Sequence, residues 1–199
     1  MSFVDQPDVF IGSTGDAHTF VVLNRRIRGA NRLLTGAGFT ARTVNGRTVY
    51  LLPPTTSEEA DERAGIAMYG LLSHTHDLVD LSWTTRRSPH SPRPEPDLRF
   101  TLTDTALTAT AATAEARSLL EHHGFTHRDG TSYEATAPVN ERDLLDTVVR
   151  AESHAHADAL CVLVELGIPT PDAIPAAPQR TPASVPGGPA TRPTRRRPH

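Results

Sequence analysis

The chain has 199 residues, 37% of them hydrophobic and 22% charged, a composition typical of one compact domain or two small ones. Its net charge is −3, and all 20 basic residues are arginines, a usage typical of a GC-rich bacterium. No apolar run approaches the ~18 residues of a membrane-spanning helix. Because the N-terminus lacks the basic and apolar regions of a secretory signal, we expect a cytoplasmic protein.

The first unit of the chain is predicted from residue 16 onward. A short apolar strand is expected at 19–23, followed by an amphipathic helix at 25–36 that stops at Gly38. The dipeptide Asn45-Gly46 predicts the turn of a β-hairpin, because both residues tolerate positive φ angles. A long helix is then expected at 57–82, with acidic residues in its first turn.

The same order of elements is predicted again in the second part of the chain. The pattern indicates a strand at 98–103, a helix at 110–123 that stops at Gly124, a hairpin turning at Asp129-Gly130, and a helix at 140–166. The segments that match are 20–23 with 100–103, 38–40 with 124–126, and 73–76 with 153–156. The repetition predicts an internal duplication of one βαββα unit.

The predicted fold class is therefore α+β, with antiparallel strands, helices packed on one side and a pseudo-twofold relation between the units. A unit of this size buries little surface alone, so the two copies are expected to share a core. The expected divisions are an N-terminal arm (1–15), the first unit (16–83), a linker rich in proline and arginine (84–96), the second unit (97–168) and a disordered tail rich in proline and arginine (169–199).

Arginines gather in the first unit, which has no acidic residue between Asp16 and Glu58. On a helix at 25–36, three arginines fall on the side opposite the apolar face, and two more lie on the adjoining hairpin. These residues are Arg25, Arg28, Arg32, Arg42 and Arg47. Guanidinium groups donate paired hydrogen bonds to phosphate oxygens, so the pattern predicts a surface that binds nucleic acid. The alternative is a solvated helix face.

The stretch from Arg32 to Pro53 resembles the recognition helix and wing of winged-helix regulators. A helix, a Gly-Phe-Thr step and a glycine turn followed by arginine carry the resemblance. One predicted strand precedes the helix, where a helix-turn-helix has two helices, so the function of that family is not carried over.

A His-x-His pattern occurs in both units, as His74 and His76 and as His154 and His156. The second copy resembles the HxHxDH metal-binding stretch of the metallo-β-lactamase fold, but Ala159 stands in place of its last histidine. Both copies are expected within helices, where residues two apart point in different directions and cannot chelate one ion. We interpret them as boundary residues. The alternative is a Zn²⁺ site where the two copies meet.

The sequence shows no phosphate-binding glycine loop, no Ser-His-Asp elbow and no HExxH motif. We therefore expect a non-enzymatic binding protein without a cofactor, associated with nucleic acid through the arginines of its first unit. An accessory or regulatory role in the bacterium or its mobile element would suit such a chain. Two alternatives stay open. One is a protein-interaction scaffold with an acidic partner, and the other is a zinc sensor or enzyme built on the duplicated histidines.

Overall fold

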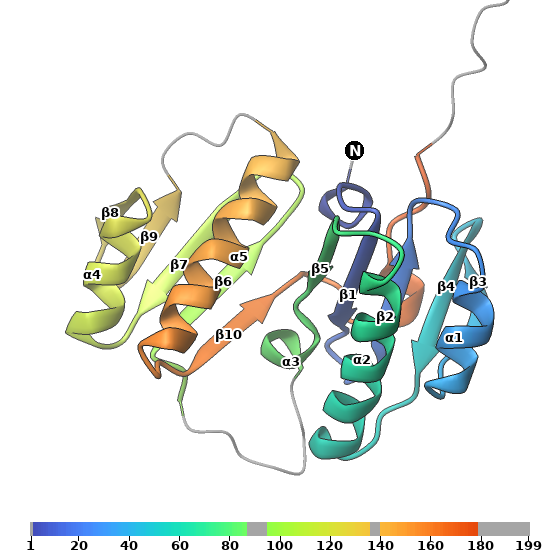
Figure 1. Ribbon diagram of the computed structural model, residues 1–199. Coiled ribbons are helices and arrows are strands. Elements are labelled where there is room, and N and C mark those ends of the chain that lie inside the picture. The colour runs from blue at the N-terminus through green and yellow to red at the C-terminus, as the bar shows by residue number, and fades with distance from the viewer. Residues whose placement is uncertain (1, 87–94, 136–139, 179–199) are drawn as a thin grey trace, which may run out of the picture.

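The computed structural model describes residues 2–86, 95–135 and 140–178, and two five-stranded sheets lie next to each other in it (Figure 1). The strands of the first sheet are β1 (Val9–Ser13), β2 (Thr19–Leu23), β3 (Thr40–Val44), β4 (Arg47–Leu52) and β5 (Leu78–Asp80). Its helices are α1 (Ala30–Gly36) and α2 (Ser57–Leu72). The strand order is β3-β4-β2-β1-β5, in which only β5 runs parallel to its neighbour.

The second sheet repeats this topology. Its strands are β6 (Leu98–Leu102), β7 (Leu107–Ala111), β8 (Phe125–Asp129), β9 (Ser132–Ala135) and β10 (Val162–Glu165). Its helices are α4 (Ala114–His122) and α5 (Glu141–Ala157). The order β8-β9-β7-β6-β10 corresponds strand by strand to the first sheet, and β10 again runs parallel to its neighbour. The equivalent edge strands β5 and β10 face each other across the boundary between the units (Figure 1).

The α+β class and the duplication are confirmed, but each unit holds two more strands than the predicted βαββα pattern. One lies beside the first strand and the other follows the long helix, so the repeat reads ββαββαβ. The match of 20–23 with 100–103 was wrong by one strand, because β2 corresponds to β7 and β6 corresponds to β1. Alternating threonine and alanine in β7 has the period of a strand, whereas a helix had been expected from residue 110.

The glycine signals placed the helix ends and the first hairpin correctly, whereas the second hairpin turns at 130–131, one residue later than predicted, because Asp129 still pairs with Ser132. Gly38 and Gly124 have φ angles of 92° and 78°, which end α1 and α4 in the left-handed region that glycine tolerates. Asn45 and Gly46 both have positive φ, 48° and 77°, as the turn between β3 and β4 requires.

Both long helices end earlier than predicted. α2 ends at Leu72 and α5 at Ala157, and the apolar residues beyond them form β5 and β10. Short apolar runs of this kind fit a buried strand as well as a buried helix, so periodicity alone does not separate them.

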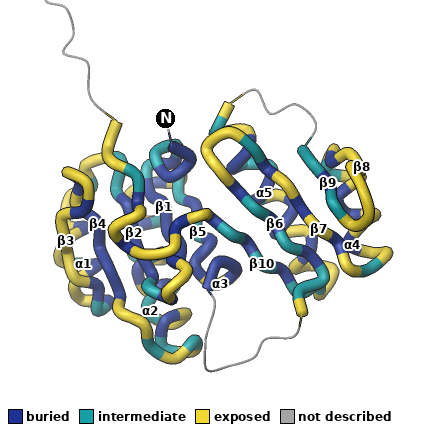
Figure 2. Tube along the Cα trace, turned by 180° about the vertical axis from the view of Figure 1, so that it is seen from behind, coloured by how far each residue is buried: buried dark blue, intermediate teal, exposed yellow. Residues whose placement is uncertain are grey.

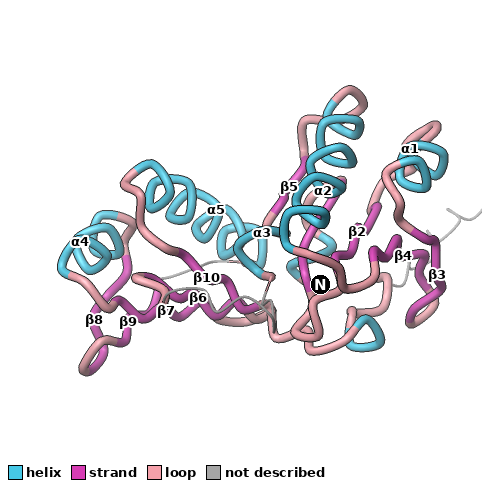
Figure 3. Tube along the Cα trace, turned by 90° about the horizontal axis from the view of Figure 1, so that it is seen from below, coloured by secondary structure: helices cyan, strands magenta, loops and turns pink. Residues whose placement is uncertain are grey.

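The helices cover one side of each sheet (Figure 3). In the first unit, alternate residues of β2 belong to two different cores: Val21 packs under α1 and α2, whereas Phe20 and Val22 point to the opposite face. In the second unit one face carries the core, with Leu98 and Phe100 buried beneath α5.

The opposite face of the first sheet is covered by the two ends of the described chain. Residues 1–15 are not a separate arm, because they hold β1 and the 3₁₀ turn η1 (Phe3–Asp5), whose Phe3 is buried. The expected tail begins too early as well, since η2 (Pro171–Ala173) and the fully buried Ile174 lie on this face. The rest of that tail, 179–199, lies outside the described residues. Figure 2 shows β1, β2 and β4 buried along most of their length, whereas β3 at the outer edge is exposed.

The predicted linker at 84–96 also begins inside the fold. A short helix, α3 (Ser82–Thr85), follows β5, and Thr84, Thr85 and Arg86 are all buried. Residues 87–94 lie outside the described residues. The linker's first residues therefore belong to the boundary between the units, where α3 packs against β10 (Figure 1).

Candidate functional site

Arg32 and Arg42 lie on α1 and β3 at the outer edge of the first unit, and Arg28 lies in the β2–α1 loop that leads to α1. Arg25 lies at the start of this loop and reaches Asp8, whose carboxylate accepts a hydrogen bond from Thr75 beside β5. Figure 1 shows α1 and β3 side by side at the end of the molecule farthest from the second unit. α1 begins at Ala30, after Gly29 with a φ of 82°, so Arg25 and Arg28 precede the helix. The prediction that Arg25, Arg28 and Arg32 share one face of a helix is therefore wrong.

Arg47 does not belong to this surface. Its side chain is 5% exposed and forms an ion pair with Asp5, whose side chain is 3% exposed, at 2.7 Å. The same guanidinium donates to Asn24 Oδ1 at 2.6 Å and to the carbonyl of Pro175 at 3.2 Å. Arg47 thus fixes β4 to both chain ends, a structural role that the sequence could not show because its partners are far away along the chain.

The other four predicted arginines are solvent-exposed. Arg25 pairs with Asp8 at 3.1 Å and Arg42 with Asp172 at 3.5 Å, and the arginine side chains of these pairs stay 63% and 58% exposed. Within residues 2–86, 95–135 and 140–178, neither Arg28 nor Arg32 has a carboxylate partner. Arg26, which the prediction left out, is exposed in the same loop.

The two His-x-His patterns lie in different kinds of secondary structure. His74 and His76 lie in the loop between α2 and β5, not in a helix, whereas His154 and His156 lie in the last turn of α5. His154 Nδ1 is 2.8 Å from Nε2 of His123, and the ring of His156 lies 4.6 Å from that of Trp83. In the described part of the chain, no three His, Cys, Asp or Glu side chains converge on a point that could hold a metal ion.

His123 and His154 line a surface cavity of about 550 Å³ between α4 and α5, together with Glu115, His122 and Asp158. Partial burial lowers the pKa of His123, and the positive charges of its neighbours His154, His122 and Arg150 lower it further. This imidazole is therefore held in its neutral form at neutral pH. No local sequence pattern could indicate the contact of His123 with His154, because it joins two helices.

Two carboxylates meet where the units adjoin, Asp80 at the end of β5 and Glu152 on α5. Glu152 is 7% exposed, and burial together with the nearby charge of Asp80 raises its pKa to about 7, although it accepts a hydrogen bond from Trp83. Burial also raises the pKa of Asp80. Because two buried carboxylates repel each other when both are charged, a proton on one of the two groups is favoured.

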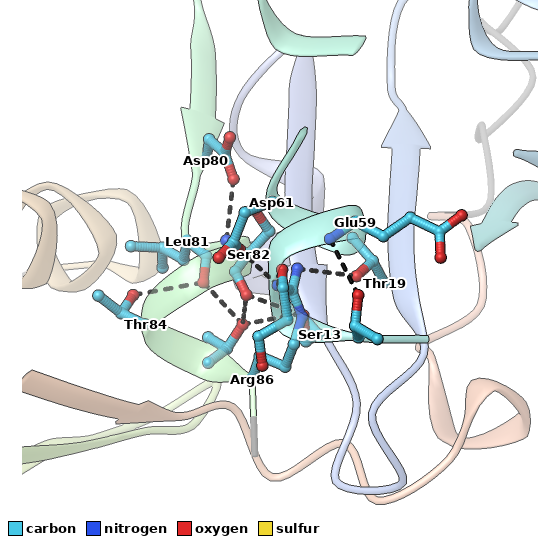
Figure 4. Close-up of polar contacts among 12 residues, drawn as sticks. Ser13, Thr19, Glu59, Asp61, Asp80, Leu81, Ser82, Thr84 and Arg86 are labelled. Carbon is cyan, nitrogen blue, oxygen red and sulfur yellow. Dashed lines mark hydrogen bonds and ion pairs between the residues drawn. The ribbon is translucent and has the colours of Figure 1, made fainter. Parts of the chain in front are cut away.

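Arg86 is the charged centre of the neighbouring polar cluster (Figure 4). Its side chain is 2% exposed, forms an ion pair with Asp61, and donates to the carbonyl of Ser57 at 3.1 Å and to Thr19 Oγ1 at 3.2 Å. Its Nε has no hydrogen-bond partner within the described ranges. The cluster connects α2, β2 and the end of α3, so we interpret its role as structural, stabilising the boundary between the units.

No protein-family model, no curated protein and no solved structure matches the chain. None of the helices in the described ranges is long and apolar enough to cross a membrane. A functional proposal for this protein therefore rests on the geometry of the chain itself.

Proposed function

We propose that the protein is a non-enzymatic, cytoplasmic binding protein that contacts nucleic acid through the outer edge of its first unit. The residues of this surface, called the outer arginine edge below, are Arg26, Arg28, Arg32 and Arg42. It differs from the surface expected from sequence by the loss of the buried Arg47 and of Arg25, which pairs with Asp8, and by the gain of Arg26.

The observation that carries the proposal is that the segment forming this edge contains no acidic residue. The chain has no Asp or Glu between Asp16 and Glu58, so the loop, α1 and β3 supply positive charge alone. Asp172, which reaches this edge from another part of the chain, makes an exposed ion pair with Arg42. Such a pair contributes about 0–1 kcal/mol, so phosphate oxygens can replace the carboxylate at little cost.

The charge of the rest of the molecule affects the expected affinity and salt dependence of binding. Residues 1–172 hold 15 arginines against 23 acids, a net charge of −8 that repels a polyanion overall. Binding through few phosphate contacts against that background should be weak and strongly dependent on salt.

The test measures binding of the full chain to a fluorescently labelled DNA duplex by anisotropy at several salt concentrations. Arg28→Glu plus Arg32→Glu should weaken binding at least about tenfold and lower the salt slope by about 0.9 for each phosphate that is no longer neutralised. Arg117→Glu plus Arg150→Glu changes the net charge equally, but on α4 and α5 of the second unit, and should have a small effect.

Equal weakening by both double variants would show that net charge, and not the outer arginine edge, governs binding. Absence of DNA binding by the unmodified chain at low salt would refute the nucleic-acid proposal. The alternative function, binding of an acidic protein partner to the exposed arginines, would then be favoured.

A further inference from the structure

The cavity between α4 and α5 brings together nitrogen donors from two helices. His123 is the C-cap residue of α4, and His154 lies in the last turn of α5, 31 residues later. Their ring nitrogens are 2.8 Å apart and their ring centroids 4.7 Å. When one imidazole donates its N–H to the unprotonated nitrogen of the other, the two rings share one proton. The same two nitrogens are also good ligands for a transition metal.

A carboxylate stands one helical turn beyond His154. Asp158 is the C-cap residue of α5, and a spacing of four residues places it on the same face of the helix as His154. It lines the same cavity as both histidines. Paired ligands four residues apart on a helix are a recurring arrangement in zinc sites.

The backbone that carries these three side chains is held by the core of the second unit. Leu120 of α4 and Ala155 of α5 are fully buried between the helices and the sheet. The N–H groups of the two C-cap residues donate to carbonyls of the preceding turns, His123 to Leu119 at 3.0 Å and Asp158 to His154 at 3.0 Å. The two imidazoles already lie in contact, whereas the Asp158 carboxylate would have to rotate toward them, because the three side chains do not converge in the described structure.

We propose that His123, His154 and Asp158 form a surface site for Zn²⁺. The ion would replace the proton that the two imidazoles share, Asp158 would turn inward as the third ligand, and water would complete a tetrahedral shell. Two imidazoles and one carboxylate suit Zn²⁺ better than Ca²⁺ or Mg²⁺, which prefer oxygen ligands alone. This inference is independent of the proposed function, since none of the three residues belongs to the outer arginine edge.

The experiment titrates ZnCl₂ into the full chain by isothermal calorimetry and follows the histidine ring signals by NMR. We expect one ion per chain with a dissociation constant in the micromolar range, and shifts of the His123 and His154 rings. His123→Gln and His154→Gln should each weaken binding at least about tenfold, and Asp158→Asn less.

The matched control is His74→Gln plus His76→Gln, which removes the other His-x-His pair and should leave the affinity unchanged. Thermal unfolding serves as a second readout, because Zn²⁺ should raise the melting temperature of the unmodified chain and of this control, but not of His123→Gln or His154→Gln. Two results would overturn the proposal. One is no heat of binding with metal in large excess, and the other is an affinity in both single histidine variants equal to that of the unmodified chain.

Discussion

In the first unit, Phe20 and Val22 of β2 are fully buried, whereas Thr108 and Thr110 take the equivalent positions of β7 and are exposed. The equivalence follows from the register of the strands. Tyr50 of β4 lies opposite Val21, between Phe20 and Val22, and Tyr133 of β9 lies opposite Ala109, between Thr108 and Thr110. The two copies thus share their topology and differ in what covers the second face of the sheet.

The difference shows how a duplicated unit became one molecule. After β10 the chain does not stop but returns to the first unit, where Leu166, Ile168 and Ile174 join the apolar core. The first sheet is therefore enclosed by helices on one face and by both chain ends on the other. The second sheet needs no such cover, since its open face carries threonines and ion pairs such as that of Arg99 with Glu165 at 2.9 Å.

The largest expected effect comes from truncating the buried face of the first sheet. Phe20→Ala should lower the free energy of unfolding by about 3–5 kcal/mol, because it removes a fully buried ring and leaves a cavity. Thr108→Ala at the equivalent exposed position should change it by less than about 0.5 kcal/mol. Urea denaturation followed by circular dichroism measures both. Similar losses for the two variants would mean that the second sheet is also covered.

Ion pairs extend the comparison from apolar to charged residues. Arg47→Leu leaves Asp5 charged and buried, and should cost about 3–5 kcal/mol of unfolding free energy. Replacing both partners, Asp5→Leu plus Arg47→Leu, should recover most of that loss. In the second unit, Arg128→Leu breaks the exposed pair with Glu134 and should cost at most about 1 kcal/mol. A loss there as large as that expected for Arg47→Leu, measured by the same urea denaturation, would contradict the contrast between the units.

The boundary between the units should make stability depend on pH through Glu152. Its pKa in the folded chain is about 7, above the ordinary value of 4.5, so the folded state binds the extra proton between these values. Stability is then greatest below pH 4.5 as far as this group is concerned, and is lost as pH rises to 7. The groups that act on it are Asp80 and Trp83, and the ring of Trp83 in turn contacts that of His156.

Glu152→Gln removes that dependence. At pH values above 7 the variant should be more stable than the unmodified chain by up to about 3 kcal/mol, since a shift of one pKa unit corresponds to about 1.4 kcal/mol. The gain should disappear near pH 4.5. Asp143→Asn, at an exposed position of the same helix, is the control. A stability difference that stays constant across this pH range would exclude titration of Glu152 as its cause.

How much the sequence revealed depends on the range of the interaction concerned. Local signals were sufficient for β2, for the glycine ends of α1 and α4, and for the hairpin turn at Asn45, because each depends on a few neighbouring φ angles. The strand β10 was merged into a helix, since an apolar run of this length carries no distinguishing period.

The candidate sites depended on contacts that no local pattern encodes. Arg47 meets Asp5 over 42 positions, and His123 meets His154 over 31. Sequence reasoning therefore counted Arg47 in a surface patch and interpreted His154 as a boundary residue of its helix. A signal for the first was present in the amino acids before β1, where Phe3 and Val4 are too apolar for a free arm.

The smallest expected effect comes from exchanging the nearly isosteric residues of the two sheets. Val22→Thr places a hydroxyl in the enclosed face of the first sheet without a partner, and should cost about 1–3 kcal/mol. Thr110→Val adds an exposed methyl group to a strand that already suits β-branched residues, and should be neutral within about 0.5 kcal/mol. Because volume and strand propensity change little in either direction, the difference between the two values isolates the cover supplied by the chain ends. Equal values in urea denaturation would mean that Ile174 and its neighbours do not exclude water from the first sheet.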